Sequence, residues 1–459
     1  MNEMNFAQRL NMVRTVSNAP NTSRYGVGRR GLFSALFPAT MLLLIVVGPW
    51  LIRLWFDVRL LSTIWTMALA LTGVVFFVSA RLTITKLERN FLVYSLVLAL
   101  VLSFVSMWSI DPAYSIPRAI ISSLFLGIAL VLGSRISAYM LNARDSFFNI
   151  VNYGLIAFLF FLLVGYFFIP DFSSGAGSLR LSGGINPNTV GMYCLYVIIW
   201  TILTRAIFGC NLFSNNILIA LTFIVLLLSF SRASWLAVLI FFITIFLLGS
   251  KLKTINNILK YLLPITIIGG VYFLIKGIPD FLSVYLSYFD RRVFMAIDID
   301  SNFQSRASAW SLLMAEFYRS PLVGYFGWYN STNFLSASVI AGEATSPHGL
   351  YVRLLSEVGL FGTITILALP LSAIFVGTVS ILRNHRSKDP LKKRQRQIYS
   401  ICVSGLIAIF VGRELFEDSY LGGYIGLTTL VVAFLVSLAF SVRIWETALL
   451  RTSEKGIRR

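Results

Sequence analysis

Charged residues are scarce in this chain of 459 residues: they make up 12% of it, whereas 57% of the residues are hydrophobic and 14% are aromatic. A soluble domain carries about 25% charged residues, so this composition excludes a soluble globular protein. Cysteine is rare as well. Cys194, Cys210 and Cys402 form neither a CxxC pair nor a zinc-ligand spacing, so we expect free thiols.

The usual signatures of cofactor and metal chemistry are also missing from the sequence. It contains no glycine-rich phosphate loop, no HExxH, no Cys/His metal pattern and no DxD-type acidic pair in a basic loop. We therefore expect no cofactor and no metal ion, and a metal-dependent nucleotide-sugar transferase is disfavoured. An enzyme with this sequence would need a substrate that is already activated and already in the membrane.

Long apolar runs are what the chain has in quantity. A membrane-spanning helix needs about 17–25 apolar residues, and about twelve runs qualify, which predicts an all-α polytopic membrane protein. They lie at 34–55, 60–80, 91–110, 117–134, 149–169, 188–204, 216–230, 233–249, 259–276, 358–382, 398–413 and 424–443. Only the polar patch Ser229 to Ser234 separates the seventh run from the eighth. If the two formed one broken element, the parity of every later span would change, but the distribution of Lys and Arg between the loops supports twelve spans with a reversal at Ser231-Arg232.

Positive charge is concentrated at the termini and in alternate loops. The net charge is +19, which could indicate nucleic-acid binding, but the basic residues lie in short segments between apolar runs, as the positive-inside bias predicts. The loop 383–396 is the most basic. We expect a bacterial inner-membrane protein with both termini in the cytoplasm and, because the first apolar run follows a polar and basic stretch, no cleaved signal peptide.

One loop is far longer than the others, and we expect it to be functional and to fold onto the external membrane surface. Within it, residues 305–319 predict a helix with Trp310 on its apolar face and Pro321 after its end. The predicted divisions are a basic N-tail at 1–33, nine spans at 34–276, the large loop at 277–347, three spans at 348–443 and a basic C-tail at 444–459.

Four polar residues fall on the external side of this topology. Arg232 lies between two apolar spans, where a guanidinium is costly unless it meets an anion, water or a partner; it is suited to phosphate, or it could simply reach the interface. His348 follows Ser346-Pro347, a helix start, where a neutral imidazole suits a general base; the alternative is a solvated loop histidine. Arg180 and Arg306 are weaker candidates.

Further polar residues follow on the same side. Tyr351, Arg353 and Glu357 come soon after His348. A second group, which follows the eleventh span, consists of Arg413, Glu414, Glu417 and Asp418. That group could shape an acceptor site, or it could be a plain network of ion pairs.

The segment from His348 reads His348-Gly349, then Gly359 and Gly362-Thr363. It resembles the signature of the bacterial O-antigen ligase family, a histidine commonly followed by Asn, Ser or Gln and then by Gly-x-x-Gly. The chain departs from this pattern at Gly349, which affects the expected substrate contacts there more than the histidine.

Other motifs resemble the wider superfamily that includes Wzy-type polysaccharide polymerases. They run in order over residues 108–363 and consist of Trp108-Ser109, Asp111-Pro112 and Arg118; Arg180, Gly183 and Asn186-Pro187-Asn188; Ser231-Arg232-Ala233; and Arg306, Trp310, Pro321-Leu322 and Gly324. The first of these is often seen in the exopolysaccharide polymerase branch.

The resemblance implies a GT-C-like glycosyltransferase that takes a glycan from undecaprenyl pyrophosphate at the periplasmic face. By analogy Arg232 and Arg306 would stabilise the leaving pyrophosphate, and His348 would take the proton of the acceptor hydroxyl in an inverting attack. The expected substrate-binding residues are Arg180, Asn186, Asn188, Trp310 and Arg353.

Several functions stay open at this point. A polymerase, slightly favoured by the motif at Trp108, would extend a lipid-linked glycan, whereas a ligase would move the glycan onto lipid A-core. A transporter of a lipid-linked sugar or small anion would carry ionisable residues in the middle of its spans, and these spans have few. A scaffold for envelope polysaccharide assembly proteins would use the basic loop 383–396 to bind anionic lipid or a partner.

Overall fold

A computed structural model describes residues 84–142, 145–169, 181–183, 186–208, 213–229, 231–248, 299–337, 349–385, 389–417, 419–421 and 427–457, with a few isolated positions besides. The predicted span at 259–276, and most of those at 34–55 and 60–80, lie outside the described residues. So do Arg180 and His348.

The regular elements of the described chain are helices. They are α4 (Lys86–Ser106), α5 (Pro112–Asn142), α6 (Asp145–Phe168), α7 (Pro187–Phe208), α8 (Phe213–Ser229), α9 (Arg232–Leu247), α12 (Ile299–Arg319), α13 (Ser331–Ala337), α14 (Leu350–Arg383), α15 (Pro390–Ile407), the π-helix η4 (Ala408–Arg413) and α16 (Leu427–Ile457). Among the described residues, six helices are long and apolar enough to cross a membrane, and α8, α9 and the apolar part of α16 are shorter. The described part of the chain is therefore all-helical and has the long apolar helices of a polytopic membrane protein.

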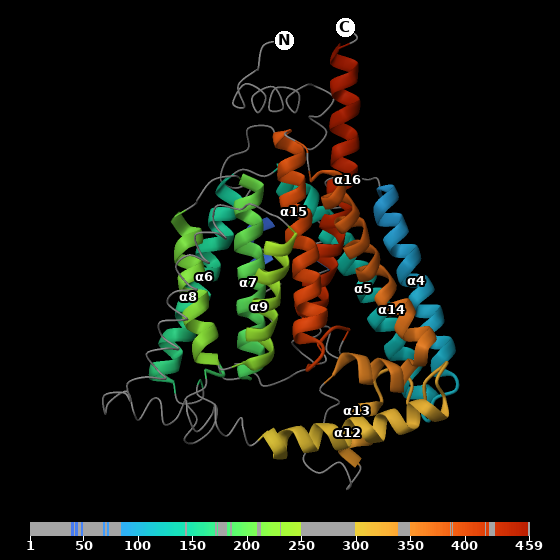
Figure 1. Ribbon diagram of the computed structural model, residues 1–459. Helices are drawn as coiled ribbons and strands as arrows, with labels where there is room; N and C mark the ends of the chain where they lie inside the picture. Colours follow the sequence, from blue (N-terminus) through green and yellow to red (C-terminus); the bar gives the residue numbers. More distant parts are fainter. Residues whose placement is uncertain are drawn as a thin grey trace.

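The chain reverses direction at Ser231-Arg232, as predicted. Helix α8 ends at Ser229, Ser231 is the residue before α9, and α7 packs against both helices. A Cβ on Gly191, in the second turn of α7, would lie 2.6 Å from Ser231 Cβ. The end of α8 and the beginnings of α7 and α9 therefore lie at one end of the helix bundle, the lower end in Figure 1.

The opposite end of the bundle gathers basic residues. Arg135 in α5 forms a buried ion pair with Glu88 in the first turn of α4, with Nη2 2.8 Å from Oε2. Arg205 near the end of α7 donates to Asn216, and Arg396 in α15 donates to the carbonyl oxygen of His385 at 2.7 Å. The last turns of α16 project from this end (Figure 1). We propose that it faces the cytoplasm, as the loop charges predict.

Cysteine labelling in intact cells tests this orientation. We expect Asp111→Cys, at the lower end of the bundle, to react with a membrane-impermeant maleimide, and His385→Cys, at the upper end, to react only after the membrane is opened, because both side chains are exposed. The native Cys194 and Cys402 are buried, and Cys210 would be replaced by serine. The reverse labelling pattern would contradict the assignment.

The large loop contributes a helix that lies across the lower end of the bundle. Helix α12 runs across this end and packs on α14, with the short α13 beside it (Figure 1). The helix predicted at 305–319 is confirmed: it begins earlier, at Ile299, and ends at Arg319, before Pro321. Its buried face carries Ala309 and Leu313, which pack with Phe326 and Leu335. This apolar cluster attaches the described part of the loop to the bundle.

Helix α14 is broken at Gly359, where φ is 62° and ψ is −164°. The turn that follows α12 accepts the two backbone N–H groups after the break: Leu360 N donates to Pro321 O at 2.9 Å, and Phe361 N to Leu322 O at 3.1 Å. A Cβ on Gly359 would lie 2.5 Å from the nitrogen of Gly324. We call this backbone contact between residues 321–327 and 356–361 the clasp. It joins the two glycine motifs that the sequence shows far apart.

Candidate functional site

The predicted site residues lie on several elements. Arg232 is the first residue of α9, and Arg306 lies in α12, but the structure describes neither side chain. Arg180 and His348 fall outside the described residues. Asn186, Asn188, Trp310 and Arg353 are described, and all of them come from segments at the lower end of the bundle.

Asn186 and Asn188 form the beginning of α7. The Asn186 side chain accepts the backbone N–H of Asn188 at 2.8 Å, and Pro187 is the first helical residue, which together make a typical helix start. Asn186 is exposed. Asn188 donates to Glu417 at 2.9 Å and so links α7 to the turn after η4.

Trp310 lies against the beginning of α14. A Cβ on Gly349 would lie 3.2 Å from Trp310 Cζ2 and 3.4 Å from the carbonyl oxygen of Leu415. A larger residue at position 349 would therefore press on the indole ring. Gly349 departs from the ligase pattern, and its lack of a side chain lets the Trp310 ring lie close to the backbone directly after His348.

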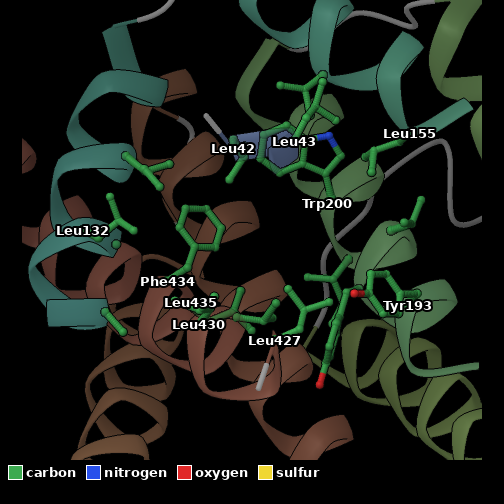
Figure 2. Close-up of a pocket in the computed structure, with 18 residues that line it drawn as sticks. Leu42, Leu43, Leu132, Leu155, Tyr193, Trp200, Leu427, Leu430, Phe434 and Leu435 are labelled. Atoms are coloured by element: carbon green, nitrogen blue, oxygen red, sulfur yellow. The ribbon is translucent and has the colours of Figure 1, made fainter. Parts of the chain in front are cut away.

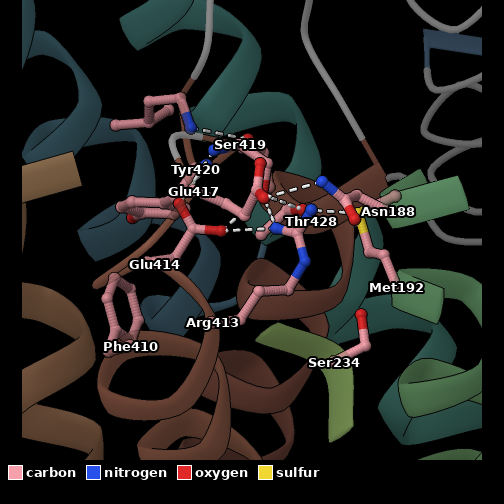
Figure 3. Close-up of polar contacts among 12 residues, drawn as sticks. Asn188, Met192, Ser234, Phe410, Arg413, Glu414, Glu417, Ser419, Tyr420 and Thr428 are labelled. Carbon is pink, nitrogen blue, oxygen red and sulfur yellow. Dashed lines mark hydrogen bonds and ion pairs between the residues drawn. The ribbon is translucent and has the colours of Figure 1, made fainter. Parts of the chain in front are cut away.

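A buried polar cluster is formed by residues of α7, η4, the turn after η4 and α16 (Figure 3). Arg413 at the end of η4 pairs with Glu414 at 2.6 Å. Ser419 is bonded to both, and its hydroxyl lies 2.7 Å from the hydroxyl of Thr428, which also accepts from Tyr196 at 2.7 Å. From Asn188 to Tyr196 the contacts of this cluster extend about 12 Å along α7 into the bundle.

Sequence reasoning marked the charged members of this cluster and Asn188. Arg413, Glu414 and Glu417 stood out as charges after an apolar span, and the ion-pair interpretation is correct for the first two. Tyr196 and Thr428 were missed, because single hydroxyl groups inside apolar runs carry no pattern in the sequence. Only the packing of α16 beside α7 brings them together.

Arg353 and Glu357 are fully buried in the first part of α14. Glu357 accepts the backbone N–H of Tyr329 at 3.0 Å and both the N–H and the hydroxyl of Ser331, at 3.2 and 2.6 Å. Arg353 Nε lies 3.9 Å from Glu357 Oε2, and its Nη2 donates to the carbonyl oxygen of Tyr420 at 3.0 Å. The Arg353 side chain therefore contacts protein groups and has no exposed surface for a substrate in this conformation.

An apolar cavity of about 110 Å³ lies between α5, α6, α7 and α16 (Figure 2). Leu132, Leu155, Trp200 and Phe434 line it, together with Tyr196, whose hydroxyl belongs to the polar cluster. The cavity thus adjoins the polar cluster on its apolar side. Within the described part of the chain, no group of His, Cys, Asp or Glu is placed to hold a metal ion.

Comparison with known proteins assigns part of the chain. Residues 217–367 match the family model of the O-antigen ligases, and no curated protein matches the chain. The matched segment runs from α8 into α14 and contains Arg232, Arg306 and His348.

Proposed function

We propose that this chain is a membrane glycosyltransferase acting at the periplasmic face, a proposal supported by the match of residues 217–367 to the O-antigen ligase family model. Its donor is a glycan on undecaprenyl pyrophosphate, and its acceptor is a second glycan. Polymerisation is the preferred activity. Ligation of the glycan onto lipid A-core is the alternative.

One observation carries this proposal: segments far apart in the sequence meet at one end of the bundle. Ser231, directly before Arg232, lies against Gly191 of α7, and Gly349, directly after His348, lies against Trp310 of α12. Asn188 of α7 is bonded to Glu417 in the turn that receives the start of α14. The predicted anion-binding and proton-accepting positions therefore belong to neighbouring elements.

The proposed reaction exchanges one bond at the anomeric carbon. An acceptor hydroxyl attacks this carbon and forms the new glycosidic bond, while the bond to the pyrophosphate breaks on the opposite face and the configuration inverts. His348 takes the hydroxyl proton, and Arg232 and Arg306 stabilise the charge on the leaving pyrophosphate. The donor is already activated, so the protein mainly positions the reactants and stabilises this charge.

The remaining residues would bind the substrates. Asn186 and Arg180 offer polar groups for sugar hydroxyls, and Asn188 could exchange its contact with Glu417 for one with the acceptor. Trp310 offers an aromatic surface beside Gly349.

The preference for polymerisation rests on the motif at Trp108-Ser109. In the structure this segment packs on the clasp: Ile110 N donates to Tyr325 O at 3.2 Å, and a Cβ on Gly327 would lie 2.4 Å from Ser109 Cβ. A motif typical of the polymerase branch thus contacts the part of the large loop that is attached to α14.

Purified protein in liposomes, supplied with a lipid-pyrophosphate glycan, tests the proposal. We expect longer lipid-linked glycans and one free undecaprenyl pyrophosphate for each bond formed. Arg232→Ala should lower this release by about 10²–10³-fold, the usual effect of removing a group that stabilises developing negative charge. If no free undecaprenyl pyrophosphate appears with the wild-type protein and either acceptor, the enzyme class is wrong.

A further inference from the structure

The two residues that the proposed reaction needs most belong to separate segments of the chain. Arg232 begins α9, and His348 precedes α14 by one residue, Gly349. The segment 408–421, made of η4 and the turn after it, contacts both helices, and we call it the bridge. The conformation of the bridge therefore sets the distance between the beginning of α9 and the beginning of α14.

The bridge receives the beginning of α14 through four hydrogen bonds. Leu350 N donates to the carbonyl oxygens of Glu414 and Glu417, at 2.9 and 3.2 Å. The Tyr351 hydroxyl donates to the carbonyl oxygen of Phe410 at 2.9 Å, and Arg353 donates to that of Tyr420. These acceptors are backbone atoms of the bridge, so its backbone conformation determines where α14 begins.

The other side of the bridge packs on α9 and α7. A Cβ on Gly412 would lie 2.5 Å from Ala237 Cα, so η4 and α9 are in backbone contact in the second turn of α9. Glu417 holds the beginning of α7 through Asn188. The bridge is thus a described segment in contact both with the helix that begins at Arg232 and with the helix that follows His348.

Glu414 holds the bridge in shape. Its carboxylate is fully buried and accepts the backbone N–H groups of Ser419 and Tyr420, at 2.8 and 2.9 Å, besides the Ser419 hydroxyl and Arg413. With four donors around it, this carboxylate is not available as a base. Through these hydrogen bonds it fixes the backbone conformation of the turn that follows η4.

The bridge also carries two costly backbone features. A π-helix is rare and occurs frequently at functional sites, and η4 is one. Leu421, a bulky residue, has a positive φ of 49°, a strained conformation that persists only where the surroundings impose it. Such features are expected where a backbone has to hold a particular geometry.

We propose that Glu414 is a positioning residue for glycan transfer: through the bridge it sets the beginning of α14 relative to that of α9. Arg353, bound to the bridge at Tyr420, is a second positioning residue, which replaces the expectation that it binds substrate. The inference rests on the proposed function, because it assumes that His348 and Arg232 act together. Glu414 itself does not touch either substrate.

The opposite end of the helix bundle provides a matched control. Glu88 is also a buried carboxylate paired with an arginine, Arg135, and it lies far from the bridge. Removing either carboxylate takes the ion-pair partner away from a buried arginine, which is strongly destabilising wherever it occurs. Comparison of the two changes therefore separates loss of stability from loss of alignment.

The experiment measures transfer by Glu414→Gln and Glu88→Gln in liposomes at equal amounts of folded protein. We expect Glu414→Gln to lower kcat by about 10²-fold, the effect of misplacing reacting groups by about 1 Å, with the donor KM unchanged. Glu88→Gln keeps the wild-type kcat. Tyr351→Phe, which removes one hydrogen bond between α14 and the bridge, lowers kcat in the same direction by a smaller factor and serves if Glu414→Gln does not fold.

Two results would overturn the inference. One is an equal kcat for the Glu414→Gln, Tyr351→Phe and Glu88→Gln proteins; the other is a raised donor KM with an unchanged kcat, which would make Glu414 a binding residue. Wild-type transfer by Arg232→Ala and His348→Ala would instead refute the proposed function. If those two variants are inactive while Glu414→Gln transfers at the wild-type rate, only the positioning role is wrong.

Discussion

Replacing His348 with alanine lowers glycan transfer by about 10²–10⁴-fold, the usual contribution of a positioned general base. The imidazole is proposed to take the acceptor proton as the new bond forms, and the chain has only one other histidine, His385. The donor KM should stay unchanged, because Arg232 and Arg306, not His348, are proposed to hold the pyrophosphate. Single-turnover transfer in liposomes with a saturating donor measures this effect on the chemical step.

His385→Ala is the matched control for this change. His385 is exposed at the other end of the bundle, and its described hydrogen bonds use its backbone N–H and carbonyl oxygen, so loss of the imidazole should leave transfer unchanged. Wild-type transfer by His348→Ala would contradict the assignment of the base. Equal losses in both histidine variants would point to an effect on folding.

Gly359→Ala destabilises the protein by roughly 3 kcal/mol or more, because two costs add at this position. The backbone has φ 62° and ψ −164°, a region essentially restricted to glycine. In addition, the new Cβ would lie 2.5 Å from the nitrogen of Gly324 and from the carbonyl of Leu322, which are backbone atoms that cannot move without opening the clasp. We expect a large fall in melting temperature in detergent and a low yield of folded protein.

Gly405→Ala provides the comparison. Gly405 lies inside α15, and the nearest atom that a Cβ there would meet is the end of the Leu435 side chain, at 3.0 Å. Alanine favours a helix over glycine by about 1 kcal/mol. This gain offsets the cost of displacing the end of the Leu435 side chain, so the change should be close to neutral. Equal melting temperatures for the two variants would show that the clasp does not hold α14 as described.

The positions of the helices along the chain were largely predictable from the sequence. Apolar runs of sufficient length predicted the membrane helices that the structure describes, and polar residues at Ser229 to Ser234 predicted the reversal between α8 and α9. The helix before Pro321 was predicted from its apolar face and from the proline. These features are local: each follows from the residues within one or two turns of it.

The sequence motifs also indicated the superfamily, and the match of residues 217–367 to the O-antigen ligase family model supports this interpretation. The motifs did not explain why their glycines are needed. Gly324 and Gly359 are far apart in the chain, and each requires glycine because backbone atoms of the other's segment lie against it. That reason exists only once α12 and α14 are packed together.

The sequence alone determined that this protein lies in a membrane, where the chain reverses, and which end of the bundle gathers the polar motifs. Tertiary structure decided how the members of the site are held: that Arg353 is buried, that hydroxyl groups from α7 and α16 meet at Arg413 and Glu414, and that a bridge joins α9 to α14. The physical reason is range. Hydrophobicity and charge act on each segment separately in the membrane, whereas a buried polar group is satisfied only by partners that packing brings from elsewhere in the chain.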